Sequence, residues 1–250
     1  MLFKTEKTGL SKTQREILSI LEYNDVKIIS RDEIIRLIRK YNLSSNPSAF
    51  VLRLIKNKVL AKFKRKVYYV IPLGKFGGSS ILSEYDLVTE YLGNNNYYFG
   101  LYSALYHFKL IDQIPNKLFV FNMNYSMNKK IKGYNIRFIK ILNKKYFGII
   151  KEAYFYSDME RTLIDTLYYS DIIPLNQALE IFKTARYNFN KIFEYAKKYN
   201  SIKLFKLLGY ITNNKKLYNY LKTKGLLNKY STFNNTGKDE LIQKWKIRLK

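Results

Sequence analysis

The stretch KFKRKVYYVIP, Lys62–Pro72, decides how the first part of the chain folds. Two short β-prone runs flank the consecutive cations Lys64, Arg65 and Lys66, which is the pattern of a strand, a tight turn and a second strand. Three like charges in one turn repel each other, whereas a solvated turn tolerates almost any polar residue. The cations therefore favour a nearby polyanion over simple solvation of an exposed turn.

Three amphipathic helices are predicted before this hairpin. Ser11 and the Ser-x-x-Glu capping box of Ser30 and Glu33 open the first two, and Asn46 followed by Pro47 opens the third. Apolar residues at helical spacing mark the inward faces: Ile17, Leu18 and Leu21, then Ile34, Leu37 and Ile38, then Val51, Leu54 and Ile55.

The order helix, helix, helix, strand, turn, strand predicts a winged helix-turn-helix in residues 1–75. In such a module the third helix enters the major groove and the hairpin, or wing, lies along phosphates. Small residues at the helix start suit close approach to the backbone, and cations further along reach guanine edges or phosphates. The predicted DNA-binding residues are Ser45, Ser48, Ala49, Leu52, Arg53, Lys56, Lys62, Lys64, Arg65 and Lys66.

The charge of the chain also points to a polyanion. The formal net charge is +26 over 250 residues, and nucleic acid is the first candidate partner, with an anionic membrane second. Residues 1–75 hold 17 Lys and Arg against 6 Asp and Glu, and residues 191–250 hold 15 against 3, so the basicity lies at the two ends. A nucleotide-composition bias that enriches Lys, Asn, Ile and Tyr explains part of it.

Several function classes are disfavoured by composition. The chain has no cysteine and one histidine, which excludes disulfides, thiolate chemistry and His-rich metal sites, so we expect no cofactor and no metal. There is no long apolar run and no secretory leader, and we therefore expect a cytoplasmic protein without a membrane span.

The Gly- and Ser-rich stretch 74–80 predicts a boundary between residues 1–75 and 76–250. Beyond it we expect a helix at 101–108, strands near 117–121, 134–142 and 147–150, and mainly helices thereafter, which gives an α+β class. A basic helical part begins near residue 191. Its lysines could form a second DNA surface, a solvated face, a surface for an acidic partner or a membrane-binding face: Lys203, Lys206, Lys215, Lys216, Lys222 and Lys224.

The carboxylates Asp158, Glu160 and Asp165 suggest an alternative, a metal-dependent nuclease or nucleotidyl-transfer enzyme. Against it, Ser157-x-x-Glu160 reads as a capping box and Arg161 with Asp165 as an i,i+4 ion pair. We therefore favour structural roles and no enzyme activity. The lone His107 and the pairs Tyr97–Tyr98 and Tyr102–Tyr106 are interpreted as packing residues in preference to catalytic or base-stacking ones.

Four ordered motifs follow the basic wing, and a closing segment ends the chain: Tyr68–Pro72, Tyr97–Leu105, Ser157–Asp165 and Leu208–Tyr210, then Lys244–Arg248. Through these segments the chain resembles the AbiEi family of antitoxins and transcriptional regulators. The resemblance spans nearly the whole chain. One departure concerns the end of the third helix, where the family usually carries Gly and this sequence has Asn57-Lys58, so Asn57 is expected to supply the left-handed cap.

The resemblance implies an autorepressing antitoxin of a type IV toxin–antitoxin system. Its winged helix would bind inverted repeats in its own promoter, with two copies on the double-stranded DNA, and residues 76–250 would form the antitoxin domain. The implied toxin is nucleotidyltransferase-like and is opposed without a stable complex. A stand-alone DNA-binding regulator with no toxin partner is the remaining alternative.

Overall fold

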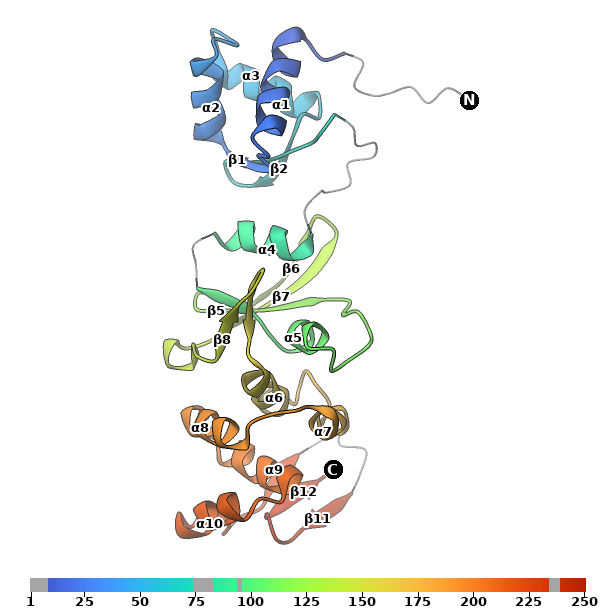
Figure 1. Ribbon diagram of the computed structural model, residues 1–250, viewed down its shortest axis with the longest axis vertical. Coiled ribbons are helices and arrows are strands. Elements are labelled where there is room, and N and C mark those ends of the chain that lie inside the picture. The colour runs from blue at the N-terminus through green and yellow to red at the C-terminus, as the bar shows by residue number, and fades with distance from the viewer. Residues whose placement is uncertain (1–8, 74–82, 94–95, 234–238) are drawn as a thin grey trace, which may run out of the picture. The chain divides into compact units, whose positions relative to one another are not determined.

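The computed structural model describes residues 9–73, 83–93, 96–233 and 239–250, and its fold is α+β (Figure 1). The chain divides into two compact units, Met1–Gly93 and Asn94–Lys250. This division differs from the predicted boundary after residue 75, because a helix that follows the Gly/Ser-rich stretch belongs to unit 1. The stretch 74–80 itself lies outside the described residues.

Unit 1 has its elements in the predicted order, with one short strand that the sequence did not indicate. That strand, β1, follows the first helix and joins the hairpin in a sheet. The elements are α1 (Lys12–Tyr23), β1 (Ile28–Ser30), α2 (Arg31–Lys40), α3 (Pro47–Lys56), β2 (Leu60–Lys64), β3 (Val67–Val70) and α4 (Glu84–Leu92).

The predicted helix starts are confirmed. Ser11 caps α1 in a capping box with Gln14, Ser30 does the same for α2 with Glu33, and the Asn46 side chain accepts from the Ala49 backbone N–H. The end of α3 differs from expectation. Asn57 has φ −88° and Lys58, at φ +54°, takes the left-handed position instead. Lys58 N–H bonds to the Ile55 carbonyl, which closes the helix end.

The three strands of unit 1 lie in the order β1-β3-β2, all antiparallel. The register between β2 and β3 shifts between Lys62 and Lys64, next to the hairpin tip. The three helices cover a small apolar core to which the strands also contribute. Its members include most of the predicted inward-facing residues, with Leu37 and Ile55 only partly buried: Ile17, Leu18, Leu21, Ile34, Ile38, Val51 and Leu54.

Unit 2 contains a six-stranded mixed sheet in the order β6-β7-β5-β4-β9-β8. Strands β5 and β7, and β4 and β9, run parallel, whereas the other pairs are antiparallel. Three of these strands coincide with predicted ones. The strands are β4 (Tyr97–Phe99), β5 (Leu118–Asn122), β6 (Met127–Ile131), β7 (Tyr134–Lys140), β8 (Ile149–Lys151) and β9 (Phe155–Ser157).

Helices follow the sheet, as expected, but the chain ends in a small sheet that was not predicted. Its order is β10-β12-β11, with β10 and β12 parallel. The remaining elements are α5 (Tyr102–His107), the 3-10 turn η2 (Asn143–Lys145), α6 (Met159–Tyr168), α7 (Leu175–Thr184), α8 (Phe189–Tyr199), α9 (Ile202–Thr212), α10 (Lys215–Thr223), β10 (Ser231–Phe233), β11 (Glu240–Ile242) and β12 (Ile247–Leu249).

A buried ion pair joins α6 to its neighbours. Arg161 Nε lies 3.0 Å from Asp165 Oδ2, and neither side chain is exposed to solvent. Arg161 also donates to the Tyr98 hydroxyl at 2.8 Å and to the carbonyl of Lys145 at 2.8 Å, while the Tyr199 hydroxyl donates to Asp165. The predicted i,i+4 pair is therefore confirmed, and it holds β4, η2, α6 and α8 together.

Candidate nucleic-acid interface

The outer face of α3 carries half of the predicted DNA-binding residues. The inward positions Phe50, Val51 and Leu54 fix the rotation of the helix, because they pack in the core of unit 1. Residues between them then face solvent, and α3 has no acidic residue. The exposed or half-exposed members of this face are Ser48, Ala49, Leu52, Arg53 and Lys56, and the exposed Ser45 precedes the helix.

Two arginines are attached to serines around the start of α3. Arg31 Nη2 donates to Ser48 Oγ at 3.1 Å, and Arg53 Nη2 donates to Ser44 Oγ at 3.4 Å. The Arg53 guanidinium also lies over the Phe50 ring, 5.4 Å from its centroid. These contacts hold both guanidinium groups on the protein surface beside the first turn of α3.

The hairpin tip is attached to the first residue of α2. Lys66 has φ +59°, and its carbonyl accepts from the Arg31 backbone N–H at 2.8 Å. Lys62, Arg65 and Lys66 are exposed. Arg31 therefore bonds to the hairpin tip through its backbone and to the start of α3 through its side chain. The sequence analysis missed Arg31, whose only signal was its place directly after the Ser30 cap.

Lys64 differs from the two cations that follow it. Its Nζ donates to the carbonyls of Glu90 at 3.2 Å and Tyr91 at 3.1 Å, in the last turn of α4. The neighbouring Phe63 ring meets Tyr91 edge-on, with centroids 6.3 Å apart. An ammonium at a helix C-terminus satisfies free carbonyls and the negative end of the dipole. Lys64 thus binds the hairpin to α4, while Arg65 and Lys66 face solvent.

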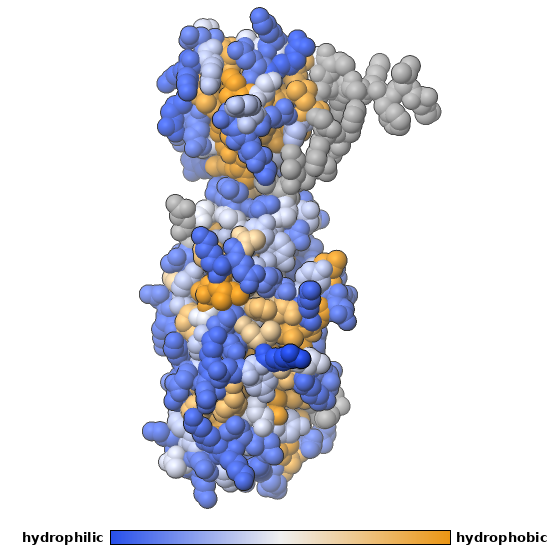
Figure 2. All heavy atoms as spheres, viewed as in Figure 1, coloured by the Kyte–Doolittle hydropathy of each residue, from blue (hydrophilic) through white to orange (hydrophobic). Residues whose placement is uncertain are grey.

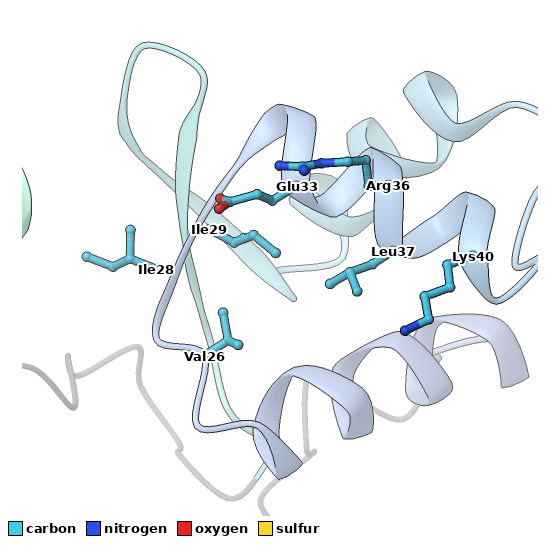
Figure 3. Close-up of a pocket in the computed structure, with 7 residues that line it drawn as sticks. All are labelled: Val26, Ile28, Ile29, Glu33, Arg36, Leu37 and Lys40. Atoms are coloured by element: carbon cyan, nitrogen blue, oxygen red, sulfur yellow. The ribbon is translucent and has the colours of Figure 1, made fainter.

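The visible face of unit 1 carries many hydrophilic residues, with hydrophobic residues between them (Figure 2). An open groove of about 630 Å³ lies beside β1 and α2, and none of the predicted DNA-binding residues lines it. The sequence analysis did not identify this groove, although all of its lining residues lie within one stretch of the chain, residues 26–40. Figure 3 shows the residues: Val26, Ile28, Ile29 and Leu37 with the charged Glu33, Arg36 and Lys40.

The predicted second basic surface of unit 2 loses one member. Lys206 is only 2% exposed, its ammonium donates to the Lys229 carbonyl, and burial lowers its pKa. Lys216 is exposed and donates to Asn190 Oδ1 at 3.4 Å, which links the starts of α8 and α10. The other predicted lysines are exposed, namely Lys203, Lys215, Lys222 and Lys224.

The carboxylates near the start of α6 bind protein groups. The predicted Ser157–Glu160 capping box is wrong, because Asp158 is the cap and accepts from the Arg161 backbone N–H at 2.8 Å. Ser157 Oγ bonds instead to the Thr162 hydroxyl. Asp158 also accepts from the Tyr195 hydroxyl at 2.8 Å. The start of α6 is thereby joined to α8.

Lys191 of α8 completes this cluster. Its Nζ lies 3.2 Å from Asp158 and 2.8 Å from Glu160, and Glu160 also accepts from the Asn188 backbone N–H at 2.9 Å. Within the described ranges, no group of three Asp, Glu, His or Cys side chains is placed to hold a metal ion. The same residues include no helix with the length and apolarity to cross a membrane.

This cluster predicts a pH effect on stability. Burial alone would raise the pKa of Glu160, but the bonds from Lys191 and Asn188 lower it below its usual value. Its stabilising contribution is therefore present above the pKa of an unfolded glutamate, about 4.3, and is lost as pH falls through the lowered folded value. We expect Glu160→Gln to lower the urea midpoint at pH 7 and to differ less from wild type near pH 3. An equal difference at both pH values would contradict this.

The lone histidine and the pair Tyr97–Tyr98 belong to the packing of unit 2, whereas Tyr102 is half-buried and Tyr106 is exposed. His107 stacks on Tyr156 with centroids 4.0 Å apart and bonds Glu152 at 3.0 Å. Tyr97 and Tyr98 are buried in β4. The packing role that the sequence indicated for these three residues is confirmed, and a base has no access to the two buried rings.

Comparison with known proteins shows the fold. No protein-family model matches the chain, and no curated protein matches it. The crystal structure of the RV2827C protein from Mycobacterium tuberculosis is similar, with a TM-score of 0.72 at 10% sequence identity, over 96% of this chain and 92% of that one. At this identity the likeness concerns the fold alone.

Proposed function

We propose that the protein is a sequence-specific regulator of transcription that binds double-stranded DNA with unit 1. In this proposal unit 1 acts as a winged helix-turn-helix, with α3 in the major groove and the hairpin along phosphates. The observation that carries it is the double contact of Arg31, which bonds both the Lys66 carbonyl and Ser48. The contact joins α3 and the basic hairpin tip in one scaffold, so their cations can meet one duplex together.

The resemblance to AbiEi supports a narrower role, that of an autorepressing antitoxin without enzyme activity. The target would be inverted repeats in the protein's own promoter, to which two copies of the protein bind. The protein would act in the cytoplasm. A nucleotidyltransferase-like toxin would be opposed without a stable complex. Footprinting on the upstream region tests the first part, and two protected half-sites are expected. Rescue of cells that express a neighbouring toxin gene tests the second, and failure to rescue would overturn the antitoxin role.

The salt dependence of DNA binding separates the hairpin cations. Each phosphate contact contributes about 0.9 to the slope of log K against log salt concentration. We expect the Arg65→Ala, Lys66→Ala double variant to lower the slope by about 1.8 and to weaken binding to all sequences. Lys64→Ala should weaken binding with little change of slope, because its ammonium binds α4 and only positions the hairpin. Fluorescence anisotropy over a salt series measures both.

Lys64→Arg serves as the matched control, since it keeps a cation able to donate to the α4 carbonyls, and affinity should largely return. If the double variant keeps the wild-type affinity and slope, the hairpin is not on phosphates. If Lys64→Ala lowers the slope as much as a single change at Arg65, Lys64 contacts a phosphate in the complex. Its ammonium would then leave the α4 carbonyls when DNA binds.

A further inference from the structure

A large apolar side chain stands in the middle of the outer face of α3. Leu52 is 68% exposed, although Phe50, Val51 and Leu54 on the same helix are buried. Residues three and four apart on a helix are neighbours on its surface, so Ser48, Ala49, Leu52 and Lys56 form one stripe. The stripe therefore presents a methyl and an isobutyl group between a hydroxyl and an ammonium.

A single exposed leucine is common and says little by itself. The surroundings make this one informative, because α3 has no acidic residue and cations border the stripe. Lys56 is its last member, Arg53 adjoins it, and the exposed Arg65 and Lys66 belong to the hairpin that Arg31 joins to α3. A partner with an apolar protein surface would leave these cations without counter-charges. A polyanion that also offers apolar groups complements both the cations and the stripe.

In a DNA major groove the apolar group on a base edge is the C5-methyl of thymine. We propose that Leu52 and Ala49 read thymine methyl groups, so that this protein's half-site carries thymine at the positions facing α3. This inference rests on the proposed function, since it requires α3 to enter the major groove. It adds the class of base that is recognised, and it makes Leu52 a specificity-determining residue.

Selection and base substitution test the inference. The full chain is first used to enrich duplexes from a randomised library, and each thymine of the enriched site is then replaced by deoxyuridine, which lacks only the methyl group. Burying one methyl contributes about 0.8 kcal/mol, so removing it should weaken wild-type binding about fourfold at the contacted positions. Leu52→Ala should bind the thymine and uracil duplexes with more nearly equal affinity.

Leu52→Met is the matched control, because it keeps an apolar side chain and should keep most of the discrimination. An exposed position leaves the fold intact, so an unchanged thermal midpoint is expected for both variants. Equal wild-type affinity for every uracil duplex and its parent would overturn the inference while leaving the proposed function standing. A change of oligomeric state in Leu52→Ala with unchanged discrimination would also overturn it, assigning Leu52 to a contact between copies. Failure to enrich any duplex would instead remove the proposed function.

Discussion

Replacing Arg161 by alanine is expected to lower the free energy of unfolding of unit 2 by about 3–5 kcal/mol, because it leaves the Asp165 carboxylate buried without its partner. Burial alone would lower the pKa of Arg161, but the nearby carboxylate raises it, so the guanidinium remains charged. Tyr98 and two backbone carbonyls would also lose their donor. Urea denaturation followed by circular dichroism measures the loss.

The double variant Arg161→Met, Asp165→Leu is the control for this prediction. Apolar side chains of similar size remove both charges together, and such replacements of a buried pair are often neutral or stabilising. Two tyrosine hydroxyls still lose partners, so we expect an intermediate stability. If Arg161→Ala unfolds at the wild-type urea midpoint, water or another cation must replace the guanidinium, and the pair is not needed to hold β4, η2, α6 and α8 together.

The second large effect concerns the contact of Trp245 with Gly209 of α9. Trp245 is 2% exposed, and a Cβ built on Gly209 would lie 2.1 Å from its ring. Trp245→Ala should cost about 3–5 kcal/mol through lost burial and a cavity. Gly209→Ala should cost about 1–3 kcal/mol, although alanine has the higher helix propensity, because the indole must move. Thermal and urea unfolding of the full chain measure both changes.

A double-mutant cycle makes this prediction specific. In a Trp245→Leu background the large ring is absent, so Gly209→Ala should cost much less than in the wild type. If the cost of Gly209→Ala is the same in both backgrounds, the glycine is required for some reason other than the ring. Tyr218, which meets Trp245 edge-on with centroids 5.5 Å apart, gives a comparison site: Tyr218→Phe should show no such coupling.

The features that the sequence predicted well depend on residues close to one another in the chain. The starts of α1, α2 and α3 were located because a capping side chain and the N–H groups it accepts from lie within three residues of each other. The hairpin followed from adjacent β-prone runs. In unit 2, apolar runs located β5, β7 and β8 but not the terminal sheet, because each of its strands has only 3 residues, too few to show an alternating pattern.

The site shows the same limit in its side chains. Exposure of the α3 face follows from helical spacing, and it was predicted. The partner of Lys64 lies 26 residues away on α4, and the two contacts of Arg31 come from different elements, so neither contact has a local signal. Lys206 follows the exposed Lys203 by three residues on α9, yet it is buried, and its ammonium donates to the carbonyl of Lys229, 23 residues further along the chain.

The link between Lys64 and the last turn of α4 affects the conformation of the hairpin tip in the free protein. Two carbonyl dipoles of α4 offset part of the positive charge of the Lys64 ammonium. Repulsion among the cations of the hairpin tip is therefore reduced even when no polyanion is bound. Binding of a polyanion would then restrict few side-chain and backbone torsions of the tip. The entropy cost of ordering, which is larger for a flexible arm, would be small. Such a rigid tip should dock in a single fast kinetic phase.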